Sequence, residues 1–174
     1  MTAFVAPTED ILFSLHHVAG AGALAAWDPE LAGDILGHFA GFAERVIAPL
    51  NAVGDRQHAQ LVDGRVRMPD GFVAAYAQLA QDGGQGLTAP AAFGGMGASP
   101  LIAAGVSELF SGANHAMQMV CNLVPGAIAT LMKYGTAAQQ NASIPKLASG
   151  AALSTMCLTE AQAGSDLSAI RCRS

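Results

Sequence analysis

The stretch MCLTEAQAGSDLSAI, residues 156–170, holds the densest run of side chains that could take part in chemistry. It begins with apolar residues, passes through a Thr-Glu pair, and reaches Gly164, Ser165 and Asp166. Hydroxyl and carboxylate groups beside a glycine can hold a ligand through side chains and through a closely approaching backbone. The same residue types are typical of a strand that ends in a turn. Residue types alone favour that simpler interpretation.

A second candidate for chemistry is a lone carboxylate. Glu108 is the single formal charge between residues 83 and 132, so it could be a buried general base. An acid in such a place more often bonds to neighbouring backbone, and we favour that interpretation. His16 and His17 are adjacent and point to different sides of a helix, so they share no ligand face. We therefore predict no metal site.

Other motifs exclude common enzyme classes. The sequence GAGALA at residues 20–25 matches a dinucleotide fingerprint, but the preceding stretch is helical in pattern and no βαβ unit follows. A GxSxG nucleophile elbow and a GKS or GKT phosphate loop are absent. The three cysteines (Cys121, Cys157 and Cys172) show no CxxC spacing, which favours reduced thiols and predicts a cytoplasmic protein.

Composition predicts a helical protein whose helices are covered on several sides. The 174 residues are 52% hydrophobic and 12% charged, roughly half the usual charged share. The net charge of −5 offers no basic surface for nucleic acid. No apolar run of about twenty residues is present, so we expect no membrane span, and the N-terminus does not resemble a signal peptide.

Caps and prolines place the first helices. Asp28 and Pro29 predict the start of a long amphipathic helix, and Pro49 with Asn51 predict its end. A polar, glycine-containing surface connection is expected over residues 52–71. A further helix is expected from about Asp70 to Asp82.

The second half of the chain predicts more helices and then a change of period. Ser99 and Pro100 open one helix, and another is expected from about Met117 to Tyr134, bent near Pro125. Thr136 and Gln139 form a capping box for a helix interrupted at Pro145. The apolar segment at residues 151–159 predicts an entering β-strand.

The charge-poor stretch at residues 83–132 allows two explanations. Its helices are either buried inside their own domain or form a wall against a ligand or a partner subunit. Composition favours burial inside the domain. If the helices instead form a wall against a partner subunit, a non-catalytic helical interaction module is the alternative function.

Three ordered motifs resemble acyl-CoA dehydrogenases. MCLTEAQAGSDLSAIR resembles that family's flavin loop, M/Y-x-x-T-E-P-x-A-G-S-D. FGGMGAS resembles its E-x-GG-x-G loop, and YGTAAQQNASIPKLASG resembles its YG-x-x-x-Q-K-x-x-x-L-P-x-x-x-x-G segment. The resemblance covers roughly residues 72–174. The N-terminal part is similar to a longer subgroup that includes methylthiopropanoyl-CoA dehydrogenase-like enzymes.

The resemblance implies an all-α fold, the N-terminal helical domain of such an enzyme, with the first strand of a following β-domain. The expected divisions are residues 1–50 as a helical extension with the first long helix, 51–150 as the helical domain, and 151–174 as the start of the β-domain with its flavin loop. The chain would then be an N-terminal fragment of a homo-oligomeric flavoprotein of fatty acid metabolism.

The resemblance also assigns roles. Met156, Leu158 and Thr159 would lie against the flavin of FAD, and Gly164 would let backbone approach it. Ser165 would touch both FAD and the acyl-CoA substrate. The acyl chain would be lined by Met117 and Cys121.

The catalytic Glu of such enzymes lies in a C-terminal domain, and no position here matches it, so the chain alone is expected to be inactive. Electron-transfer flavoprotein or a similar acceptor would take the electrons. The family Pro is Ala161 here and the family Lys is Gln140, so a drifted or truncated paralogue stays open.

Overall fold

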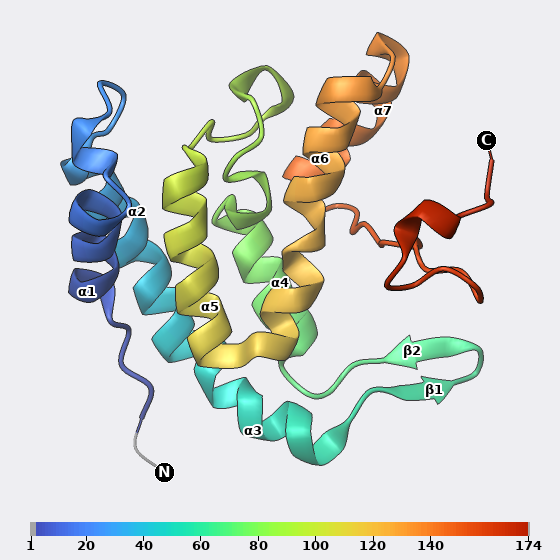
Figure 1. Ribbon diagram of the computed structural model, residues 1–174. Helices are drawn as coiled ribbons and strands as arrows, with labels where there is room; N and C mark the ends of the chain where they lie inside the picture. The colour runs from blue at the N-terminus through green and yellow to red at the C-terminus, as the bar shows by residue number, and fades with distance from the viewer. Residues whose placement is uncertain (1–2, 174) are drawn as a thin grey trace.

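Helices dominate the computed structural model, which describes residues 3–173 (Figure 1). The α-helices are α1 (Thr8–Phe13), α2 (Pro29–Phe42), α3 (Ala48–Gln57), α4 (Phe72–Gln81), α5 (Pro100–Cys121), α6 (Leu123–Tyr134) and α7 (Ala137–Ala148). The strands are β1 (Gln60–Val62) and β2 (Arg65–Arg67). Single turns of π- or 3-10 helix lie at Ser14–Val18, Ala21–Ala23, Ala43–Ile47, Gly84–Gly86, Ala91–Phe93 and Leu167–Ala169. The all-α prediction is confirmed.

The first long helix begins as predicted and continues past its predicted end. The Asp28 carboxylate accepts the backbone N–H of Glu30 and of Leu31, both at 3.0 Å, and Pro29 follows it. The prediction that Pro49 ends the helix is wrong, because the chain passes through a π-helical turn directly into α3. Pro49 lies in the first turn of α3, directly after the π-helical turn, so its missing N–H falls where the helical hydrogen-bond pattern changes.

The helix that begins after Ser99 is broken once. Ser99 caps α5 as predicted, accepting the Ile102 N–H at 3.3 Å. The break falls at Asn114, whose φ of −160° and ψ of 91° are not helical. A second helical segment follows the break, close to the start expected at about Met117, and runs to Cys121. The single helix expected from Met117 to Tyr134 is interrupted at Asn122, between α5 and α6.

The capping box of α7 is present. Thr136 Oγ1 accepts the Gln139 N–H at 3.3 Å, and Gln139 Oε1 accepts the Thr136 N–H at 2.8 Å. Pro145 does not interrupt the helix, contrary to expectation, and α7 ends only at Ala148. Pro145 lies in the last turns, so the hydrogen bond that it removes is one of the helix's last.

The predicted surface connection is exposed but has regular structure. Its first part continues α3 to Gln57, and its second part is the antiparallel hairpin β1–β2. Asp63 and Gly64 form the turn with φ of 49° and 75°, as expected of an Asp-Gly hairpin turn. All six strand residues are exposed.

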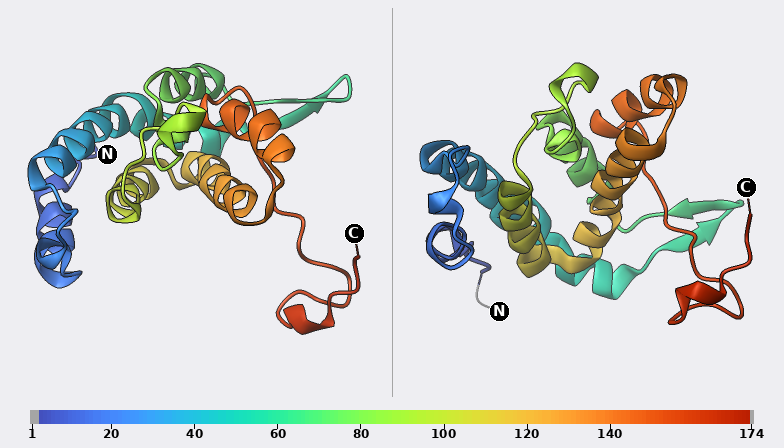
Figure 2. Two further views of the ribbon diagram at one scale, coloured as in Figure 1. Left: turned by 90° about the horizontal axis from the view of Figure 1, so that it is seen from above. Right: turned by 45° about the horizontal axis from the view of Figure 1, so that its top comes forward.

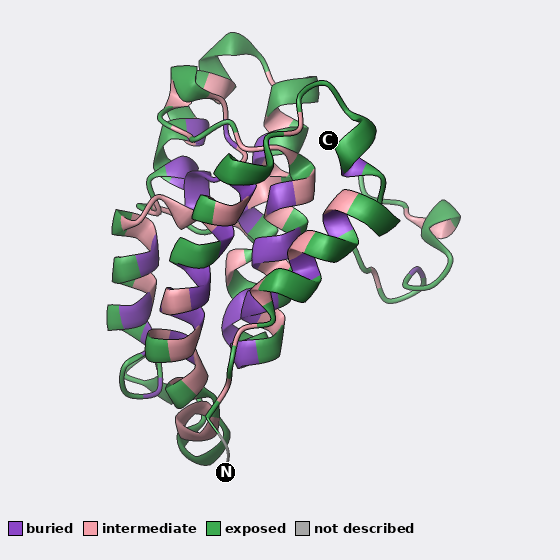
Figure 3. Cartoon of the chain, turned by 90° about the vertical axis from the view of Figure 1, so that its left-hand side faces the viewer, coloured by how far each residue is buried: buried purple, intermediate pink, exposed green. Residues whose placement is uncertain are grey.

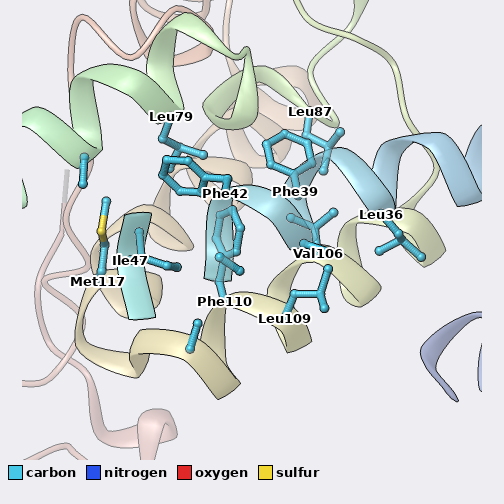
Figure 4. Packing of buried hydrophobic residues seen from close by; sticks show 14 of the residues in the cluster. Leu36, Phe39, Phe42, Ile47, Leu79, Leu87, Val106, Leu109, Phe110 and Met117 are labelled. Atoms are coloured by element: carbon cyan, nitrogen blue, oxygen red, sulfur yellow. The ribbon is translucent and has the colours of Figure 1, made fainter. Parts of the chain in front are cut away.

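The main core lies between α2, α4 and α5 (Figure 4). The ring of Phe110 is 5.8 Å from that of Phe39, edge to face, and 5.6 Å from that of Phe42. A smaller buried cluster joins α6 and α7 through Val124, Ile128, Ile144 and Leu147. The buried faces of α2, α4 and α5 match the apolar stripes of the sequence (Figure 3), whereas α3 has no buried residue.

The expected strand at residues 151–159 is not formed. The segment leaves α7 and runs away from the helices, with no regular strand structure (Figures 1 and 2). A strand needs a neighbour to pair its backbone groups, and the described chain places no other strand beside this segment. An isolated bridge follows the segment, between Glu160 and Ala163.

Candidate functional site

A cleft of about 670 Å³ lies between α3, α4, the base of the hairpin and the second half of α5. Its walls are mostly apolar, including Phe72, Tyr76, Met117, Val120 and Cys121. The structure therefore brings together Met117 and Cys121, the two residues expected to line an acyl chain. Their spacing of four residues puts both on one face of α5.

The Cys121 thiol and the Tyr76 hydroxyl of the cleft wall are uncharged at neutral pH. Burial raises the pKa of the Cys121 thiol to about 11, while the neighbouring Gln85 amide acts in the opposite direction. Burial also raises the pKa of Tyr76, with a smaller contribution from Cys121. The Tyr76 hydroxyl donates a hydrogen bond to the Gly150 carbonyl at 2.9 Å. Cys121 thus serves as apolar wall and not as a thiolate nucleophile.

Neighbouring residues of α5 face different ways, as expected from helical spacing. Val120 lines the cleft, whereas Met119 is 58% exposed outside it. Burial within the domain therefore accounts for some, but not all, of the apolar residues in the charge-poor stretch. Met119, Leu123 and Met132 leave apolar side chains on its surface.

A second, smaller cavity was not foreseen from the sequence. It has a volume of about 60 Å³ and lies between the Gly84–Gly86 turn and α5. Gln85 is 3% exposed. Its side-chain amide is close enough to the Cys121 thiol to act on its pKa, but neither amide atom meets hydrogen-bond geometry with any described residue. The sequence feature that could have indicated this buried polar group is a glutamine in a mostly apolar stretch that contains no charged residue.

The five predicted flavin residues (Met156, Leu158, Thr159, Gly164 and Ser165) all lie in the C-terminal segment and are exposed. A Cβ built on Gly164 would lie 3.5 Å from the Thr159 methyl, so these two residues are neighbours. The segment extends away from the helices (Figure 2), although Leu153 at its start lines the cleft wall. The structure therefore groups the predicted residues into two sets and does not join them.

The C-terminal segment closes into a loop through one carboxylate. Glu160 accepts the backbone N–H of Arg171 at 3.0 Å and that of Cys172 at 2.7 Å. These hydrogen bonds, first that of Arg171 and then that of Cys172, lower the pKa of Glu160. The carboxylate therefore remains charged at neutral pH and holds the two ends of the loop together.

The other polar candidates are placed outside any site. Glu108 is exposed on α5, so the buried-base interpretation is wrong. Within residues 3–173, no three His, Cys, Asp or Glu side chains are grouped to hold a metal ion. In the same range, no helix has the length and apolar character needed to cross a membrane. The three cysteines are unpaired thiols.

Comparisons with known proteins identify the family of this chain. The model of the acyl-CoA dehydrogenase N-terminal domain matches residues 33–151. The 3-methylmercaptopropionyl-CoA dehydrogenase of Ruegeria pomeroyi is 37% identical over 175 residues, covering 97% of this chain and 30% of that protein. The (2S)-methylsuccinyl-CoA dehydrogenase of Cereibacter sphaeroides is 36% identical over 135 residues, covering 78% of this chain and 23% of that protein.

A mammalian relative matches a shorter part. The mitochondrial very long-chain specific acyl-CoA dehydrogenase of Rattus norvegicus is 33% identical over 94 residues, covering 53% of this chain and 14% of that protein. The chain thus spans less than a third of the length of these curated relatives. Because the domain model runs from within α2 to just past the end of α7, the chain belongs to the acyl-CoA dehydrogenase family through its N-terminal domain.

Proposed function

We propose that this chain forms the N-terminal part of an FAD-dependent dehydrogenase that acts on an acyl-CoA thioester. In that reaction a Glu outside this chain takes the α-proton, and the β-hydride leaves to the flavin. The main support for this proposal is that the family domain leads directly into an exposed loop with the flavin-loop residue types. The relatives' names, all of them acyl-CoA dehydrogenases, support the same class of substrate.

The residues present in the loop fit a flavin. Met156 is 71% exposed and Leu158 is 43% exposed, so both offer apolar surface for a flat ring. Thr159 offers a hydroxyl for the ring's polar edge, and Gly164 beside it leaves room for close backbone approach. Ser165 is exposed and can donate to FAD or to the thioester substrate. When bound, FAD supplies the hydride acceptor.

The apolar cleft is proposed to receive the acyl group. Met117 and Cys121 supply soft, polarisable walls that suit a thioether or an alkyl chain. Leu153 lies in the same wall at the start of the C-terminal segment. The segment between Leu153 and Thr159 would then run from the acyl end of the substrate to the flavin.

The proposed partners follow from the reaction. Electron-transfer flavoprotein or a similar acceptor would reoxidise the flavin, and the protein would form a homo-oligomer. The exposed apolar side chains of Met119, Leu123 and Met132 offer surface for burial against further protein. A cytoplasmic location remains a prediction.

The same exposed side chains also favour a second candidate, a non-catalytic helical interaction module. The two functions differ in flavin binding. Purify the complete gene product that carries this chain, record its visible flavin spectrum, and add acyl-CoA thioesters of different chain length. A bound flavin that is bleached by a thioester supports the dehydrogenase. A colourless protein that stays colourless with added FAD would leave the interaction module.

The chain of 174 residues provides the companion measurement. Mixed with FAD and an acyl-CoA, it is expected to leave the flavin oxidised, because the base is proposed to lie elsewhere. Flavin reduction by this chain alone would overturn the assignment of the base.

A further inference from the structure

We propose that Glu160 is a positioning residue that closes the loop of residues 160–172 and thereby sets the backbone of Gly164 and Ser165 for the flavin. The inference rests on the proposed function for its link to flavin. The closure itself rests on hydrogen bonds of the described chain.

The carboxylate accepts three N–H groups of the loop, two from its backbone and one from the Gln162 side chain. Each of its oxygens accepts one N–H from the far end of the loop, Oε2 that of Arg171 and Oε1 that of Cys172. Gln162 Nε2 also donates to Oε2. A carboxylate can accept several N–H groups at once, and such charge-assisted hydrogen bonds are stronger than neutral ones.

The backbone of Glu160 makes a second closure inside the first. Its N–H donates to the Ala163 carbonyl at 2.9 Å, and its carbonyl accepts the Ala163 N–H at 3.1 Å. Ala163 is 1% exposed, unlike the residues on either side of it. One residue thus fixes the position immediately before Gly164 and also the end of the loop.

This closure lies beside a departure from the family pattern. The family Pro restricts the backbone after the Thr-Glu pair, and Ala161 does not. Without that restriction the loop has more conformations to lose on ordering. The family pattern carries the Glu together with the Pro, so in this chain the ordering of the loop depends more heavily on the carboxylate.

The test compares Glu160→Gln and Glu160→Ala with the matched control Glu30→Gln, an exposed acid at the start of α2. Glu160→Gln keeps the size but turns an amide N–H₂ toward backbone donors. Hydrogen exchange of the chain is expected to speed up about tenfold or more at Ala163, Arg171 and Cys172 in both variants, with no change in α5. Unchanged exchange in the loop would overturn the inference and leave the proposed function standing.

The second measurement uses the complete gene product loaded with FAD. The Glu160 variants are expected to shift the flavin's visible absorption and fluorescence, while Glu30→Gln leaves both unchanged. A loosened loop with an unaltered flavin spectrum would overturn the positioning role. A wild-type protein that binds no flavin would instead overturn the proposed function, and the exchange result would still report the closure.

Discussion

Gln85 leaves both atoms of its side-chain amide buried without a hydrogen-bond partner in the described chain. An unpaired buried amide costs roughly 1–3 kcal/mol relative to a satisfied one. The cavity that it faces, at about 60 Å³, has room for ordered water, so water and a dry void are the two physical possibilities. Their energetic consequences differ in sign, which makes this residue a useful probe.

We predict that Gln85→Met raises the free energy of unfolding by about 1 kcal/mol, because an apolar side chain of similar length removes an unmet polar group. Urea denaturation measures the change. The matched control is Gln118→Met, which loses a 2.8 Å hydrogen bond to Ser107 and should be destabilised by about 1 kcal/mol. A loss of stability in Gln85→Met would show that water satisfies the amide.

Cys121 permits a prediction on reactivity. Burial moves its pKa from 9.0 to about 11, so at pH 8 the thiolate is roughly 100-fold scarcer than in an unperturbed thiol. Iodoacetamide should therefore modify the exposed Cys157 and Cys172 well before Cys121, as followed by peptide mass spectrometry. Modification of Cys121 should become fast only as the pH approaches 11. Equal rates at pH 8 would contradict its burial in the cleft wall.

Helices show which features the sequence could predict. Helix starts depend on residues within one turn, so Asp28, Ser99 and Thr136 were identified correctly. The course of the chain at Pro49 and at Asn114 depends on packing against distant residues. The Asn114 side chain donates to the Ile47 carbonyl, 67 positions away, at 3.1 Å. No local pattern contains that information.

The same reasoning applies to the candidate site. Met117 and Cys121 were named through the family resemblance, and their helical spacing puts both on one face; their contact with an acyl chain stays a prediction. The closure by Glu160 was not predicted, because its partners lie eleven and twelve residues ahead in an irregular loop. Gln140, which stands where the family has Lys, has a structural role. Its Nε2 donates to the carbonyls of Leu131 and Gly135, both at 3.1 Å, at the end of α6.

The break in α5 can be tested through its hydrogen bonds. Asn114 also accepts the Met117 N–H at 3.1 Å, and its side chain is 1% exposed. Asn114→Ala should lower the free energy of unfolding by about 2–3 kcal/mol, because two buried backbone groups lose their partner. Asn122→Ala, at the exposed turn before α6, serves as the control with a small expected change. Equal effects in urea denaturation would show that the break does not depend on this side chain.

The described residues form two buried apolar clusters. The larger joins α2, α4 and α5, and the smaller joins α6 and α7, from which the C-terminal segment departs. The Gly84–Gly86 turn lies between them, and a Cβ on Gly86 would come within 2.8 Å of the Ala148 carbonyl oxygen. The two clusters therefore meet at a close backbone contact. The division at residue 50 remains a prediction, and α3 crosses it.

Matched substitutions should separate the two clusters. Leu109 and Ile144 are both fully buried, one in each cluster. Leu109→Ala should cost about 2–5 kcal/mol and speed hydrogen exchange throughout α2 and α5, because it opens a void in the main core. Ile144→Ala removes a similar volume, but its faster exchange should concentrate in α6, α7 and the start of the C-terminal segment. If both variants speed exchange equally everywhere, the helices unfold as one cooperative unit. In that case the position of the C-terminal segment would depend on the stability of the whole domain and not on α7 alone.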